Sequence, residues 1–164
     1  MMATFDFADA CSEGQLKKAK KLLLKHPDKI TISEMEFGFR KASLEGHANV
    51  VEWILSVNPE VVSIIKGGME DLFYAVCSQG HLDIAKILLT LKPDLDTTMD
   101  NENPFVGACV LGYLELAKWL LSVRPDTDIS FVTTGNARTK ILYDVEHDDV
   151  EEWLKQVMLE RETK

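Results

Sequence analysis

Several features that would narrow the class of this protein are absent from its sequence. No stretch reaches the roughly 18 apolar residues that span a bilayer, so we expect no membrane partner. The segment Met1–Ala10 is acidic and has no continuous apolar run, which is unlike a secretory signal peptide. Cys11, Cys77 and Cys109 lie far apart and are odd in number, which indicates reduced thiols in an intracellular compartment. We therefore expect a cytoplasmic location.

Basic charge and catalytic motifs are also scarce. The chain has 18 Lys plus Arg against 27 Asp plus Glu and a formal charge of −9. This charge disfavours nucleic acid as a partner, because a protein needs a basic surface to bind phosphates. There is no phosphate-binding glycine loop, no His-Glu-x-x-His and no Gly-x-Ser-x-Gly. We predict no enzyme activity, no cofactor and no metal. The apolar share of 46% is that of a folded chain.

What the sequence does contain is a repeat. Gly14, Gly46, Gly80 and Gly112 mark four copies at spacings of 32 to 34 residues, and a degenerate fifth copy centres on Glu146. A phenylalanine precedes each glycine by seven residues, two large aliphatic residues follow it by eight and nine, and a proline follows by thirteen. The phenylalanines are Phe7, Phe39, Phe73 and Phe105, and the prolines are Pro27, Pro59, Pro93 and Pro125. Agreement at so many positions indicates one repeated structural unit.

Each copy predicts a helix, a tight turn and a second helix. Apolar residues seven, four and three positions before the glycine share one helical face, and the second helix has a broader apolar face. The glycine lies just past the first helix in a left-handed cap, and the proline ends the second helix. Asn103 and Pro104 are start signals for one first helix. Because one unit cannot bury its apolar face alone, we expect an all-α solenoid of five helix pairs with short loops.

The segments Glu45–Leu55 and Gln79–Leu89 resemble the turn and second helix of the ankyrin repeat. The resemblance covers about residues 4 to 158, and Asn103–Ser130 is similar to the ankyrin variant abundant in giant DNA viruses of amoebae. It implies an ankyrin-repeat solenoid of about four repeats plus a degenerate C-terminal capping repeat. The predicted single domain, 1–164, has approximate units 4–32, 33–66, 67–98, 99–134 and 135–164. For a viral protein, the location would be the host cell cytoplasm.

The sequence departs from the family pattern in its first helices and fingers. The usual Thr-Pro-Leu-His opening survives only as Asn103-Pro104-Phe105. The finger glycine, eleven residues before each anchor glycine, is replaced by Met35, Met69 and Asn101, of which only asparagine readily tolerates positive φ. We therefore expect irregular loops in place of regular hairpin fingers.

Three recurring residue types have structural interpretations. His47, His81 and His147 hold one repeat position, which favours a local turn role over a metal site. The cysteines share a core-facing position, which predicts buried, inert thiols. Trp53, Trp119 and Trp153 recur seven residues after the anchor position, which predicts packing on the outer helices.

The partner-binding residues follow from the resemblance, since ankyrin proteins usually bind through the fingers and the exposed edge of the first helix. By position, the finger residues Glu36, Glu70 and Glu102 form an acidic stripe that steers a basic partner surface; a solvated edge explains them equally well. The residues just before the anchor glycines are Leu44, Glu45, Ser78, Gln79, Val110 and Leu111. We expect these positions to be exposed, so that Leu44, Val110 and Leu111 form the apolar core of an interface.

Both ends carry charged helices. Lys17, Lys18, Lys20, Lys21 and Lys25 crowd the second helix of the first unit, and Asp148, Asp149, Glu151 and Glu152 begin the last helix. We interpret both as solvated capping units, which would make the chain complete; the alternative for the basic cluster is contact with nucleic acid or an acidic protein. The predicted function is a monomeric protein-interaction module that binds a protein through its concave face and modulates a host pathway. The alternative is a structural subunit that self-associates through the same apolar positions.

Overall fold

The computed structural model describes residues 2–65, 68–97, 104–127, 129 and 147–163. The chain divides into two compact units, Met1–Thr97 and Thr98–Lys164. In the described residues all regular structure is helical and no strand occurs, which confirms the predicted all-α fold. That residues 1–164 act as one domain stays a prediction.

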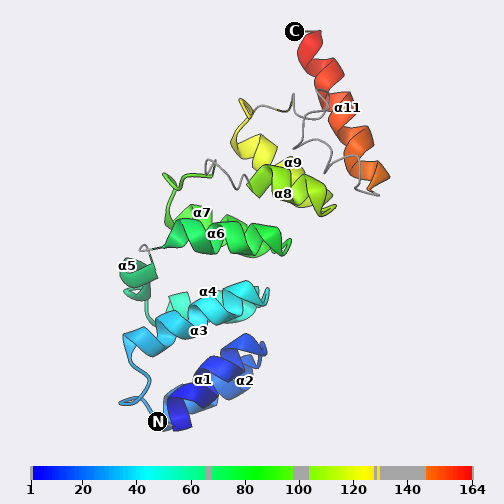
Figure 1. The fold of residues 1–164 in the computed structure, drawn as a ribbon. Helices are drawn as coiled ribbons and strands as arrows, with labels where there is room; N and C mark the ends of the chain where they lie inside the picture. The colour runs from blue at the N-terminus through cyan, green and yellow to red at the C-terminus, as the bar shows by residue number, and fades with distance from the viewer. Residues whose placement is uncertain (1, 66–67, 98–103, 128, 130–146, 164) are drawn as a thin grey trace. The chain divides into compact units, whose positions relative to one another are not determined.

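The first unit is a stack of helical hairpins (Figure 1). Its helices are α1 (Met2–Ser12), α2 (Leu16–Lys25), α3 (Ile32–Leu44), α4 (Ala48–Val57), α5 (Val61–Ile65), α6 (Met69–Ser78) and α7 (Leu82–Leu91). The pairs α1/α2, α3/α4 and α6/α7 correspond to the first three repeats. Helix α3 packs between α1 and α6, and α4 packs against α7, so each hairpin covers the apolar side of its neighbour.

The second unit contains α8 (Pro104–Val110), α9 (Leu114–Val123) and α11 (Asp148–Glu162). Helices α8 and α9 form the fourth hairpin, and α8 begins at Pro104 as predicted. Asn103 and the expected first helix of the fifth pair lie outside the described residues. Trp153 of α11 packs against Phe105 of α8 with ring centroids 6.4 Å apart, which places the last helix beside the fourth repeat.

The core consists of the positions that the repeat predicts. The residues seven, four and three before each anchor glycine are buried in all four copies, with Phe7, Phe39 and Phe73 at 0% exposure. Trp53 of the second hairpin contacts Phe7 of the first with ring centroids 6.2 Å apart, so the tryptophan packing is confirmed for Trp53 and Trp153. Ser43 stands where the other copies have cysteine, and its buried hydroxyl has no hydrogen-bond partner among the described residues.

The turn between the two helices of each repeat has the predicted left-handed glycine. Gly14, Gly46, Gly80 and Gly112 have φ between +66° and +81°. In the second repeat the amide of His47 donates to the carbonyl of Ala42 across 2.8 Å and closes the helix end. Each second helix then ends two residues before the repeated proline, for example α9 at Val123 before Pro125.

The repeated histidine contacts the preceding repeat, in addition to the local turn role that we predicted. A Cβ atom on Gly14 would lie 2.6 Å from Nδ1 of His47, and one on Gly46 would lie 2.6 Å from Cε1 of His81. His81 also places Nε2 3.1 Å from the carbonyl oxygen of Leu44 in the preceding repeat. The imidazole therefore rests on the turn of the previous copy and connects neighbouring repeats.

The expectation of irregular finger loops is wrong where the structure describes them. Met35 lies inside α3 and Met69 begins α6, and both side chains are buried. The hydroxyl oxygen of Thr31 accepts from the amide of Glu34 across 3.4 Å and starts α3 early. Gly68, at φ +76°, is the residue before α6. Asn101 lies outside the described residues.

Helix α5 is a further difference from the expected short loop. The side-chain oxygen of Asn58 accepts from the amide of Glu60 across 3.1 Å, which orders the chain around Pro59. Val61 and Ile65, four residues apart, are both buried as α5 packs against α3. The connection between the second and third repeats is thus a packed part of the first unit.

Candidate interaction surface

The residues just before the anchor glycines divide into exposed and half-buried positions. Leu44, Ser78 and Val110 each end a first helix and are half-buried, because they are adjacent to the buried core position three before the glycine. Glu45, Gln79 and Leu111 follow them and are exposed. Our expectation that the whole set is exposed is therefore wrong for Leu44, Ser78 and Val110.

The apolar members of this set do not form one continuous line within a unit. Leu44 belongs to the first unit, and Val110 and Leu111 belong to the second. Ser78 interrupts the line inside the first unit, and its hydroxyl donates to the carbonyl of Tyr74 across 2.9 Å. Leu111 is the one member that is both apolar and exposed, at 45%.

The predicted acidic stripe is largely neutralised in the described residues. Glu36 lies on α3 and forms an ion pair with Arg40 one turn later. Glu70 lies on α6 and forms an ion pair with Lys92, which holds the pKa of Glu70 below its ordinary value and raises that of Lys92. Both glutamates are helical, not finger residues, and Glu102 lies outside the described residues. Paired carboxylates project a weaker field than free ones, so steering by Glu36 and Glu70 is reduced.

Helix α3 presents an apolar ridge that the sequence analysis missed. Phe37 is 48% exposed, although it is a large aromatic residue. Phe37, Lys41 and Leu44 are spaced by four and three residues and share one face of α3. The ammonium of Lys41 lies 5.6 Å from the centroid of the Phe37 ring. Phe37 stands where the first copy has Phe5 and the next two copies have Asp71 and Asn103, and an aromatic residue at a position that is polar in the later copies is the signal that could have identified it.

Carboxylates surround this α3 ridge on the neighbouring first helices. Asp9 and Glu13, in and just past α1, are exposed, as are Glu45 at the end of α3 and Asp71 on α6. Since α1 and α6 pack on either side of α3, exposed carboxylates lie on the helices beside the one that carries Phe37, and the Lys41 ammonium lies next to the ring itself. Such an arrangement can bind a surface that is apolar at its centre and basic at its margin.

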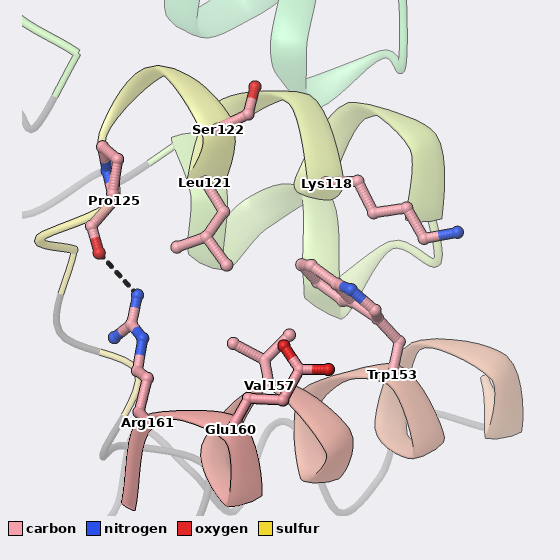
Figure 2. A pocket seen from close by; sticks show the side chains of 8 residues that line it. All are labelled: Lys118, Leu121, Ser122, Pro125, Trp153, Val157, Glu160 and Arg161. Carbon is pink, nitrogen blue, oxygen red and sulfur yellow. Dashed lines mark hydrogen bonds between the residues drawn. The ribbon is translucent and has the colours of Figure 1, made fainter. Parts of the chain in front are cut away.

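An open cleft of about 490 Å³ lies between α9 and α11 in the second unit (Figure 2). Leu121 points into it from α9, and Trp153 and Val157 point into it from α11. The guanidinium of Arg161 donates to the carbonyls of Pro125 and Thr127 across 2.7 and 2.9 Å and ties the end of α11 to the loop after α9. The cleft contains none of the predicted site residues.

The cysteines and histidines form no chemical centre in the described part of the chain. Cys11, Cys77 and Cys109 are buried, and burial raises the pKa of each thiol to about 12, as expected of inert core thiols. Among the residues that the structure describes, no group of three or more His, Cys, Asp or Glu side chains could hold a metal ion. The same residues include no helix long and apolar enough to cross a membrane.

Stacked helical hairpins that are joined by left-handed glycine turns define a helical-repeat protein. Residues 39–131 match the family model for ankyrin repeats, in three copies. The chain therefore belongs to the ankyrin-repeat family. Ankyrin repeats generally mediate protein–protein interaction and are generally non-enzymatic binding modules. A search of curated proteins found no match.

Proposed function

We propose that this protein acts by binding another protein through the exposed edge of its first helices and performs no chemistry of its own. The observation that carries the proposal is the α3 ridge, on which Phe37 is 48% exposed beside the half-buried Leu44. Aromatic side chains are frequent anchors of interfaces because a single residue buries a large apolar area. In the second unit, Leu111 supplies a comparable exposed apolar side chain at the end of α8.

The partner that fits this surface has an apolar centre and a basic margin. Asp9, Glu13, Glu45 and Asp71 are exposed on or next to α1, α3 and α6, and they attract such a margin. From the resemblance to the viral ankyrin variant, we further propose that the partner belongs to a host pathway and is met in the host cytoplasm.

The experiment that tests this function is affinity capture from host lysate with quantitative mass spectrometry. Wild type is compared with Phe37→Asp, with Leu111→Asp and with Val57→Asp as the matched control. Val57, on α4, is 46% exposed, so its substitution introduces the same charge at an equally exposed apolar position away from the first helices. All three sites are exposed, so the variants are expected to keep the wild-type circular dichroism spectrum.

We expect a protein that wild type and Val57→Asp capture and that Phe37→Asp loses. Loss of a centrally placed aromatic anchor weakens binding by about 2 kcal/mol or more, which is about thirtyfold in Kd. Identical capture by all four proteins would overturn the assignment of the surface. Loss from Leu111→Asp alone would move the interface to the second unit.

A further inference from the structure

Two helices outside the proposed binding surface each expose a leucine that folding leaves uncovered. Leu24 on α2 is 84% exposed and Leu159 on α11 is 64% exposed, the highest values for large apolar side chains in the described residues. An isolated exposed leucine is ordinary on a protein surface. The charges around these two leucines are what distinguish them, because they are opposite in sign.

The exposed face of α2 is basic. Lys17, Lys20 and Lys21 precede Leu24 by seven, four and three residues, so they lie around it on one side of the helix. Lys18 and Lys25 add to the charge, and α2 contains no acidic residue. All five lysines are exposed. A chain with a formal charge of −9 thus concentrates positive charge around one apolar side chain.

The exposed face of α11 is acidic. Glu152 precedes Leu159 by seven residues and Glu162 follows it by three, so both lie on the same side of the helix. The helix contains six acidic residues, Asp148, Asp149, Glu151, Glu152, Glu160 and Glu162. Of its two basic residues, Lys155 lies four residues before Leu159 and pairs with Glu151 on the same helix, and Arg161 binds the carbonyls of Pro125 and Thr127.

We propose that α2 of one copy of this chain docks against α11 of a second copy. Leu24 and Leu159 form the apolar centre of the contact, and the lysines of α2 face Glu152 and Glu162. A second copy is the occupant because one chain carries both complementary surfaces. The contact is heterologous, since the two helices are different, so each bound copy keeps one free α2 and one free α11. Repetition of such a contact builds rings or linear chains.

This association differs from the monomer expected from the sequence and does not depend on the proposed function. It uses neither Phe37 nor Leu111, so either proposal can fail without the other. One helix face against another makes a small interface, which is typical of weak and transient association. Because lysines and carboxylates supply much of the attraction, we expect the association to weaken as salt is added.

The test is sedimentation velocity over a range of protein concentrations at low and high salt. Wild type is compared with a basic-face variant, Lys17→Glu/Lys21→Glu, and an acidic-face variant, Glu152→Lys/Glu162→Lys. In each variant alone the two substituted positions face side chains of their own charge, so we expect Kd for self-association to rise by about tenfold or more. In an equimolar mixture each contact between the two variants again joins opposite charges, so association returns.

The matched control is Lys29→Glu/Lys86→Glu, which changes the net charge as the basic-face variant does but lies outside α2 and α11, in the loop before α3 and on α7. We expect it to associate like wild type, and Leu24→Ser to weaken association without any change in charge. Wild type that stays monomeric at every concentration would overturn the proposal. So would variants that associate like wild type, or a mixture that associates no better than its components.

Discussion

The anchor glycines are constrained in two ways at the scale of single residues. Gly112 has a φ of +75°, which is unfavourable for a residue with a Cβ atom. A Cβ there would also lie 2.4 Å from Cε1 of His147. Gly107, five residues earlier in α8, has no positive φ and would place its Cβ in open space.

We predict opposite effects for the two glycines of this unit. Gly112→Ala is expected to lower the free energy of unfolding by about 1–2 kcal/mol from backbone strain, with a further loss as His147 is displaced. Gly107→Ala is expected to raise it by roughly 0.5–1 kcal/mol, because alanine favours the helix. Urea unfolding followed by circular dichroism measures both. A Gly112→Ala variant as stable as wild type would contradict the turn geometry.

At this scale the sequence predicted the core and missed much of the surface. Phe39, Phe73 and the other core residues recur at fixed distances in sequence from the anchor glycine, and this recurrence of apolar residues correctly predicted that they are buried. The Glu70–Lys92 ion pair joins residues that no period relates, so the acidic stripe could not be recognised as neutralised. Phe37 was missed because its repeat position is aromatic in the first two copies and polar in the next two, so the position has no consistent character.

At the scale of elements, the beginning of α3 depends on Thr31. Its hydroxyl accepts from the amide of Glu34 and donates to the carboxylate of the same residue, so Thr31 is the N-cap of the helix. This cap starts the helix before Met35 and thereby sets the position of Phe37 on the exposed ridge.

We therefore predict that Thr31→Ala destabilises the protein by about 0.5–2 kcal/mol, because an amide of the first turn loses its acceptor. Thr31→Ser keeps the hydroxyl and is expected to remain within a few tenths of a kcal/mol of wild type. Thermal unfolding of the three proteins side by side gives the comparison. Equal stability of Thr31→Ala and Thr31→Ser would show that the hydroxyl cap does not stabilise the protein.

Element boundaries were predictable only where the signal repeats. The glycine and proline mark the end of each first and second helix, and those ends agree with the structure. The residue before α3 is Thr31 and the residue before α6 is Gly68. Because the two helices begin after different residues, no shared sequence pattern predicted their first residues. Helix α5 has five residues, too few for a helical period to be read from Val61 and Ile65 alone.

For the whole molecule, the buried thiols link stability to pH. Burial raises the pKa of Cys11, Cys77 and Cys109 from 9.0 to about 12. Above pH 9 the thiols of the unfolded chain lose their protons while those of the folded chain keep them. Stability that is fully present below the unfolded pKa is therefore lost as the pH rises toward the folded value.

We predict that the urea midpoint of wild type falls between about pH 8 and about pH 11. A variant with all three cysteines replaced by alanine is the control, because it keeps the other titrating groups. The urea midpoint of this variant is lower than that of wild type at about pH 8, since three buried side chains are truncated. It should fall less steeply as the pH rises. Parallel slopes for the two proteins would show that the thiols do not contribute.

The histidine contacts between copies have a consequence for anyone who cuts or recombines this array. His81 completes the turn at Gly46, so a break placed at the repeated proline separates a turn from the imidazole that covers it. The same holds for a joint inside a second helix: a cut in α4 keeps Gly14 with His47 but separates Gly46 from His81. Each joint between two copies therefore divides one glycine–imidazole contact, and a chimera should keep a histidine at this position in the copy that follows the joint.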